Sequence, residues 1–305
     1  MRVSMFVAFD DSDHGTRNAR RPRLPEAVAL AVERAGHLAV WVGLYMGGVA
    51  AAIAVLSGLR AEPLALLAAG CTGAGAYLFD RVKLRDSWMD RADRLAHPRR
   101  FGYLFRVRHA VRLLAVALGA IGSVCAFILH PALAAVTAGS FVGVVVYAGL
   151  PRPMYAAVRT RRPKDILIVK NGAVALSMTV LGVLLVGVPR IGDEGAADVL
   201  ALPALIVLGH VFVDAMLCDL DDRSADKRFG TATLPVRAGP IATWRVALVM
   251  NAALAVGALT LGDPAMLFSA LMLASLMVLA VIRPRRVRDL IDLRLPVCAA
   301  LAMMV

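Results

Sequence analysis

Nine apolar stretches, most of them close to the length of a bilayer crossing, constrain the fold of this chain more than any other feature. They cover residues 38–58, 62–79, 110–129, 131–150, 168–189, 197–218, 241–261, 263–282 and 295–305. A helix needs about 20 apolar residues to cross the hydrocarbon core of a membrane. Continuously apolar runs, unlike alternating ones, favour helices over a barrel. The sequence therefore predicts an all-α polytopic membrane protein with about nine transmembrane helices, the last of them short or truncated.

The charge of the chain is concentrated in alternate loops between these stretches. The formal net charge is +12 at pH 7, in a chain with 59% hydrophobic residues. Basic residues gather in the amino-terminal segment and in the loops at residues 81–108, 152–164, 223–237 and 283–288. The intervening loops are short and nearly uncharged. This positive-inside pattern predicts that the amino terminus and the basic loops are cytoplasmic, and it favours a cell (inner) membrane protein over a nucleic-acid binder.

The first 30 residues are polar and lack the apolar core and cleavage site of a secretory signal. We interpret 1–30 as a cytosolic polar tail and 31–305 as a single membrane domain. The sequence has no Cys/His pattern of a zinc site, no phosphate-binding glycine loop and no nucleophile elbow. It gives no support to the enzyme classes that depend on those motifs.

Three carboxylates follow the apolar stretch 197–218 at helical spacing. Asp219, Asp222 and Asp226 are three and four positions apart, so on a helix they share one face. Carboxylates at the end of a membrane span are costly unless a cation accompanies them. Mg²⁺ is the natural candidate, because it takes oxygen ligands and shares them with substrate phosphates.

The basic loop after the second apolar stretch carries a similar set, Asp86, Asp90 and Asp93. These three share a face if the helix of that stretch continues into the loop. The predicted topology places both acidic sets at the same membrane surface, where they could hold Mg²⁺ and a diphosphate between them. The alternative is that the acids of this loop pair with their arginine neighbours on the surface.

The segment from Asp219 to Pro235 resembles the second aspartate-rich motif of the UbiA-type intramembrane prenyltransferases. The matching positions are Asp219, Asp222, Asp226, Gly230, Thr233, Leu234 and Pro235. The segment 162–171, which ends in Lys170 and Asn171, also resembles the entry to the fifth helix of that family. Nine helices with acidic second and sixth loops are the family's architecture, so the resemblance extends from about residue 38 onward.

The resemblance implies Mg²⁺-dependent transfer of a polyprenyl group from its diphosphate to a lipophilic acceptor within the membrane, aromatic or of another kind. Asp222 and Asp226 would bind the Mg²⁺–diphosphate with help from Asp219, and Asp86 and Asp90 would complete the catalytic site. The side chains expected to bind the diphosphate are Lys170, Lys164 and Arg228.

The first aspartate-rich motif departs from the family's usual Asn-Asp-x-x-Asp-x-x-x-Asp. Aligning its last two acids on Asp86 and Asp90 places Val82 at the asparagine and Lys83 at the first aspartate. In a second alignment Asp80 takes the asparagine's place, and it could join Asp86 only if the helix breaks between them. Either alignment alters half of the metal site. A single-metal site, a direct Arg or Lys contact to the diphosphate, and loss of catalysis all remain open.

His210 and Asp214 lie four positions apart within the stretch 197–218. An ionisable pair inside a membrane span is a functional candidate, here as a base that takes a proton from the acceptor. The structural alternative is a hydrogen bond that holds two helices together.

Two other functions compete with the prenyltransferase interpretation. A non-catalytic family member that binds a lipid or a membrane partner would explain the altered first motif. A transporter is the weaker alternative, with His210 or Asp214 coupling uptake to ions. The acceptor, the prenyl chain length and the oligomeric state are not encoded in any motif that we identify.

Overall fold

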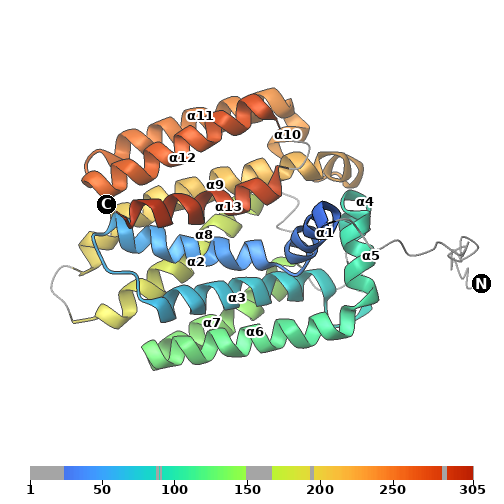
Figure 1. Ribbon diagram of the computed structural model, residues 1–305, viewed down its shortest axis with the longest axis horizontal. Helices are drawn as coiled ribbons and strands as arrows, with labels where there is room; N and C mark the ends of the chain where they lie inside the picture. Colours follow the sequence, from blue (N-terminus) through green and yellow to red (C-terminus); the bar gives the residue numbers. More distant parts are fainter. Residues whose placement is uncertain are drawn as a thin grey trace, which may run out of the picture. The chain divides into compact units, whose positions relative to one another are not determined.

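The computed structural model describes residues 24–86, 89, 91–148, 167–192, 196–283 and 287–304, and every secondary-structure element in these ranges is a helix (Figure 1). The chain divides into two compact units, residues 1–34 and 35–305. Helix α1 (Leu24–His37) begins in the first unit. Residues 1–23 of the predicted cytosolic tail lie outside the described residues.

Each of the nine apolar stretches forms a helix in the second unit. The helices are α2 (Val40–Leu56), α3 (Pro63–Val82), α6 (Arg108–Leu129), α7 (Pro131–Ala148), α8 (Leu167–Gly187), α9 (Ala196–Phe229), α11 (Gly239–Ala258), α12 (Asp263–Ile282) and α13 (Arg288–Ala302). Short helices connect them: α4 (Arg91–Ala96), α5 (Pro98–Arg106), the 3₁₀ helix η4 (Val188–Arg190) and α10 (Leu234–Arg237). The all-α prediction is confirmed for the described residues.

Five of these helices, α6, α8, α9, α11 and α12, are long and apolar enough to cross a membrane. Three of the remaining helices are shorter or less apolar. Helix α2 has 17 residues and α13 has 15, and α3 ends in the charged pair Asp80 and Arg81. By length and composition, the described part of the chain thus has five helices able to cross a membrane, or six if α1 and α2 form one bent span. The nine predicted crossings stay a prediction.

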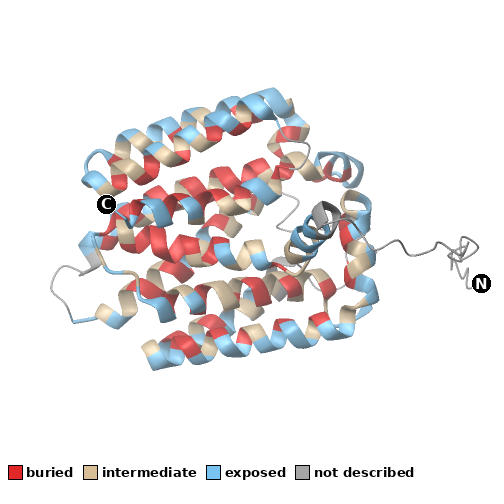
Figure 2. Cartoon of the chain, viewed as in Figure 1, coloured by how far each residue is buried: buried red, intermediate tan, exposed pale blue. Residues whose placement is uncertain are grey.

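The outward faces of several of these helices are apolar yet exposed. Leu113 of α6 is 74% exposed, Val249 of α11 is 70% exposed and Val281 of α12 is 84% exposed. Figure 2 shows exposed residues along the outer sides of α6, α11 and α12. A large exposed apolar surface is unfavourable in water and favourable against lipid tails. The chain is therefore an integral membrane protein.

Helix α2 forms much of the core of the second unit. It packs against α3, α8, α9, α12 and α13, and its residues from Gly48 to Ala54 are buried. Small side chains permit this close packing, as is usual between membrane helices. At Gly48 the backbones of two helices approach closely, because an added Cβ would lie 2.7 Å from Pro296 Cα of α13. Gly48 therefore fixes the distance between α2 and α13.

Helix α9 is much longer than a bilayer requires. Its 34 residues extend about 51 Å at 1.5 Å per residue, against a hydrocarbon core of about 30 Å. The apolar part ends near residue 218, so the last turns of α9 project beyond it with the predicted carboxylates. At this end α9 packs against α4, α10 and α13, as Figure 1 shows for α4 and α10. This end of the bundle holds the candidate site.

Candidate functional site

The end of α9 is set by residues of the segment that resembles the second aspartate-rich motif. Gly230 adopts a positive φ of 75°, a conformation open to glycine at little cost. The Thr231 N–H then donates to the Asp226 carbonyl at 2.9 Å, which is the long bond of a Schellman helix end. Thr233 precedes α10, whose second residue is Pro235. These residues stop α9 one turn after its last carboxylate and turn the chain toward α11.

Asp219 and Asp226 face the start of α8. The Lys170 Nζ lies 2.6 Å from Asp219 Oδ1 and 3.5 Å from Asp226 Oδ2. The Asn171 amide donates to Asp219 Oδ2 at 3.0 Å. Asp226 Oδ2 is buried and accepts no hydrogen bond within the described part of the chain. Lys170 thus pairs with two carboxylates, and the Asp226 oxygen that it approaches accepts no hydrogen bond from any described residue.

Asp222, which lies between them in sequence, contacts two other segments. Its Oδ2 accepts a hydrogen bond from Arg288 Nη2 at 2.7 Å, and its Oδ1 lies 2.6 Å from His97 Nε2. Arg288 opens α13, and His97 lies between α4 and α5. Asp222 is therefore the point where α9, α13 and the basic loop at residues 81–108 meet.

A second ion-pair group lies at the same loop. Asp93 of α4 accepts hydrogen bonds from Arg81 at 2.9 Å and from Arg100. Arg100 also donates to the Tyr77 hydroxyl at 3.1 Å, and the Arg81 guanidinium lies over the Tyr77 ring. Burial alone would raise the pKa of the Asp93 carboxyl, but Arg81 and Arg100 hold that pKa below its usual value. His97 follows α4 and donates its N–H to the Asp93 carbonyl at 2.9 Å, which links this group to Asp222.

The first aspartate-rich motif does not continue as one helix. Helix α3 ends at Val82, and Lys83 adopts a positive φ of 47°. The condition under which Asp86, Asp90 and Asp93 would share a face, a continuation of this helix into the loop, is therefore not met. Val82 is fully buried in an apolar cluster, so it offers nothing to a polar ligand.

The two acids on either side of this break take separate partners. Asp80 pairs with Lys83. Asp86 is paired with Arg108 at 2.9 Å and Arg112 at 2.6 Å, which anchors it to the start of α6. The helix does break between Asp80 and Asp86, as the second alignment requires. The two carboxylates nevertheless pair with different basic residues and do not form one site.

Asp90, Lys164 and Arg228 were also predicted to belong to the site. Asp90 and Lys164 lie outside the described residues. Arg228 is exposed, and two positions after Asp226 it lies about 200° around the helix, so it points away from that carboxylate. Within the described ranges, no three His, Cys, Asp or Glu side chains converge closely enough to hold a metal ion.

His210 and Asp214 contact other helices rather than each other. Asp214 accepts hydrogen bonds from Tyr45 of α2, at 2.9 Å, and from Arg294 of α13. His210 Nδ1 lies 3.1 Å from Asn251 Oδ1 of α11, while its Nε2 is buried without a partner among the described residues. These contacts bind α9 to α2, α11 and α13. The role of acceptor base stays a prediction.

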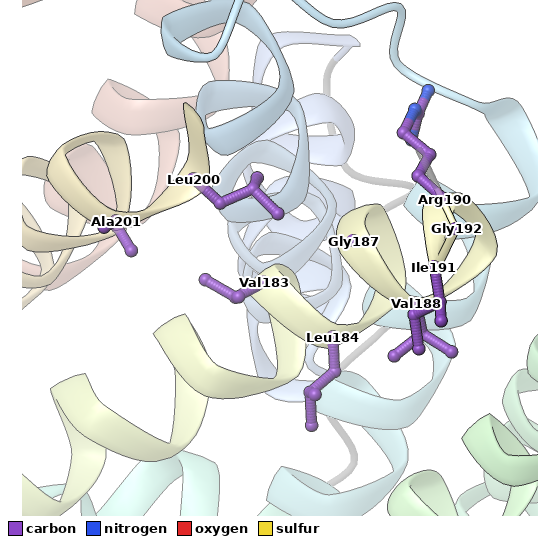
Figure 3. Close-up of a pocket in the computed structure, with 10 residues that line it drawn as sticks. Val183, Leu184, Gly187, Val188, Arg190, Ile191, Gly192, Leu200 and Ala201 are labelled. Atoms are coloured by element: carbon purple, nitrogen blue, oxygen red, sulfur yellow. The ribbon is translucent and has the colours of Figure 1, made fainter. Parts of the chain in front are cut away.

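An apolar pocket of about 470 Å³ lies at the opposite end of α9. Figure 3 shows Val183, Leu184 and Val188 facing it from α8 and η4, with Leu200 from α9. Its last lining residue, Ala204, is fifteen positions before Asp219 and therefore about 22 Å from it along the helix axis. The pocket is not part of the charged site.

Sequence reasoning missed the partners of Asp222. The basic loop at residues 283–288 predicts only the topology, and His97 is not among the predicted site residues. The one sequence feature that could have indicated His97 and Arg288 is their position, because both follow predicted spans on the predicted cytoplasmic side. Nothing in the sequence specified which carboxylate each would meet.

We compared the chain with protein-family models, curated proteins and solved structures, and none of them matches it.

Proposed function

We propose that this chain binds a prenyl diphosphate at the charged end of α9 and transfers the prenyl group to a lipophilic acceptor. The observation that carries the proposal is the meeting of α8, α9, α13 and the basic loop at residues 81–108 around Asp222 and Lys170. Buried ionisable groups are costly where a membrane span ends, and they are characteristic of sites for ions and polar substrates. An apolar bundle adjoining a charged end suits an amphiphile with an apolar chain and an anionic head.

The proposal includes a topology. All nine helices would span the membrane, with the amino terminus and the charged end of α9 in the cytoplasm of a cell with an inner membrane. The basic loops support this orientation through the positive-inside rule. It would place the diphosphate at the cytoplasmic surface and the prenyl chain among the helices.

The chemistry of the donors fits magnesium at Asp222 and Asp226. Mg²⁺ is commonly held by one or two carboxylates together with substrate phosphates rather than by a protein cage. Asp226 Oδ2 is buried, lies 3.5 Å from Lys170 Nζ and accepts no hydrogen bond among the described residues. When bound, the ion would offset the negative charge that diphosphate gains as it leaves. Asp219 stays with Lys170 and Asn171 and orients them.

Side chains of the protein would bind the diphosphate and accept the proton of the acceptor. Lys170 would bind the non-bridging oxygens of the diphosphate, since an ammonium is an effective point charge for phosphate. The bond between the first prenyl carbon and the diphosphate oxygen breaks, the acceptor bonds to that carbon, and the acceptor's proton passes to a base. Asp214 and His210 are the candidates for that base, and the acceptor itself stays open.

The test is thermal stability of the detergent-purified chain with Mg²⁺ and a series of prenyl diphosphates. A ligand at 100 times its dissociation constant stabilises by about 2.7 kcal/mol. We expect a Mg²⁺-dependent rise in wild type that is lost in Asp226→Asn. Asp198→Asn is the matched control, because Asp198 is an exposed carboxylate at the other end of the same helix.

An equal response in Asp226→Asn and wild type would contradict the proposed site. Formation of a prenylated product then separates an enzyme from a binding protein. The buried Val82 and the diversion of Asp86 to α6 favour a second candidate, a non-catalytic member that binds the lipid diphosphate without transfer. Stabilisation by ligand without product from any tested acceptor would support that candidate.

A further inference from the structure

Among the described residues, Arg288 is the arginine that pairs with the predicted metal ligand Asp222, and no sequence motif assigns it a role. Its Nη2 donates to Asp222 Oδ2 at 2.7 Å, and its Nη1 lies 3.4 Å from His97 Nε2. The side chain is only 16% exposed. A guanidinium this far from water needs an anionic partner, whether the protein is empty or loaded.

The backbone of Arg288 is fixed by Asp221, the residue that precedes Asp222 in α9. Asp221 accepts hydrogen bonds from the Val287 N–H at 3.1 Å and the Arg288 N–H at 3.0 Å. A carboxylate on the first amides of α13 satisfies donors that have no partner within the helix. Asp221 thereby holds the start of α13 against α9 and keeps the Arg288 side chain beside Asp222.

Arg288 would lose its partner when Asp222 takes a metal ion. A carboxylate oxygen that ligates Mg²⁺ shares its charge with the ion, and the ion repels the guanidinium next to it. Arg288 cannot move far, because Asp221 fixes its backbone. A diphosphate that arrives with the metal supplies new acceptors at the same place, and the planar guanidinium suits phosphate through paired hydrogen bonds.

We propose that Arg288 is a diphosphate-binding residue, which Asp222 holds in position until the metal and the diphosphate arrive together. The proposal deepens the proposed function and rests on it. It assigns Arg288 two successive partners: Asp222 in the empty protein and a diphosphate oxygen in the loaded one. Asp221 is its positioning residue.

The proposal makes opposite predictions for two ligands, which a purely structural ion pair does not. In Arg288→Gln, Asp222 is free of its competing cation, so Mg²⁺ alone should bind roughly tenfold more tightly than to wild type. At saturating Mg²⁺, a prenyl diphosphate should bind about tenfold to a hundredfold more weakly, because a charge-assisted hydrogen bond is lost. Arg288→Lys should retain an intermediate affinity for the diphosphate.

Calorimetric titration of the full-length purified chain measures both affinities, first with MgCl₂ and then with the prenyl diphosphate that most stabilises wild type. Arg283→Gln is the matched control, since Arg283 is an exposed arginine at the end of α12, and neither affinity should change. Arg288→Lys conserves the charge, so it serves as the second variant if the glutamine variant does not fold.

The outcomes are distinct. If wild type binds no prenyl diphosphate, the proposed function fails and this inference fails with it. If wild type binds and the Arg288 variants bind both ligands as wild type does, or lose both together, the assignment of Arg288 is overturned while the proposed function stands. Tighter Mg²⁺ together with weaker diphosphate binding supports the proposal.

Discussion

Replacing Asp214 by asparagine should destabilise the bundle strongly, because it leaves Arg294 buried without its anion. The Asp214 and Arg294 side chains are 3% and 1% exposed. Tyr45 donates to the same carboxylate, and Arg294 Nη1 donates to the Met272 carbonyl at 3.2 Å. Removing one member of a buried ion pair costs about 3–5 kcal/mol, since the other charge is left uncompensated.

Thermal unfolding in detergent measures this cost. At about 2–4 °C for each kcal/mol, Asp214→Asn should lower Tm by roughly 10 °C. The double variant Asp214→Leu/Arg294→Met removes both charges and fills the site with apolar side chains, so it should recover most of the loss. An unchanged Tm in Asp214→Asn, or a double variant whose loss equals the sum of the two single losses, would refute this account of the pair.

The stable double variant also tests the catalytic role that the sequence suggests for Asp214. If the chain transfers prenyl groups, and the double variant still does so at the wild-type rate, Asp214 is not the base. If transfer is lost while the Mg²⁺-dependent binding of prenyl diphosphate is unchanged, the base assignment gains support. Because binding and folding are measured separately, a structural loss cannot be mistaken for a catalytic one.

Two further predictions concern single contacts. Arg81 and Arg100 hold the pKa of Asp93 below its usual value, against the effect of burial. The stability from these ion pairs is therefore present above about pH 4 and is lost as the pH falls below that value. Between about pH 5 and pH 3, Tm of wild type should fall more steeply than Tm of Asp93→Asn, and parallel curves would contradict the assignment. Gly48→Ala should lower Tm by an amount equivalent to about 1–3 kcal/mol, because its Cβ would meet the backbone of α13. Gly139→Ala is the control in α7, where an added Cβ meets nothing within 4 Å, and it should be neutral or slightly stabilising.

The positions of the helices could be predicted from hydropathy alone. Each apolar stretch is local in sequence, and a helix is the one open-ended structure that satisfies its own backbone in lipid. Hydropathy did not predict how far each helix extends beyond its apolar stretch. Helix α9 continues as far as Phe229, whereas α3 stops at Val82. Both ends depend on local backbone conformations, at Gly230 and Lys83.

The candidate site was partly predictable for the same reason. Asp219, Asp222 and Asp226 share a face because their spacing is a property of one helix. Their partners come from segments far away in sequence, such as Arg288, which is 66 positions from Asp222. No periodicity encodes such a pairing. Lys170 was predicted through the resemblance, and its contact with Asp219 is a result of how α8 packs on α9.

The balance of charge at this end of the bundle limits how a diphosphate can bind there. Three groups of ion pairs lie there among the described residues, with four carboxylates and four permanently basic side chains in all: Asp93 with Arg81 and Arg100, Asp219 and Asp226 with Lys170, and Asp222 with Arg288.

Apart from the His97 imidazole, this set is electrically neutral when empty. A bare diphosphate would add several negative charges to a partly desolvated site, which is costly. A diphosphate that enters with Mg²⁺ has part of its negative charge neutralised by the ion. The metal can also bind the carboxylates that pair with Lys170 and Arg288 in the empty protein, which frees these two side chains for the diphosphate. Affinity for prenyl diphosphate should therefore rise steeply with Mg²⁺ concentration. An affinity that is the same in chelator and in Mg²⁺ would show that the basic side chains bind the diphosphate without any metal, and that the carboxylates serve only to hold them.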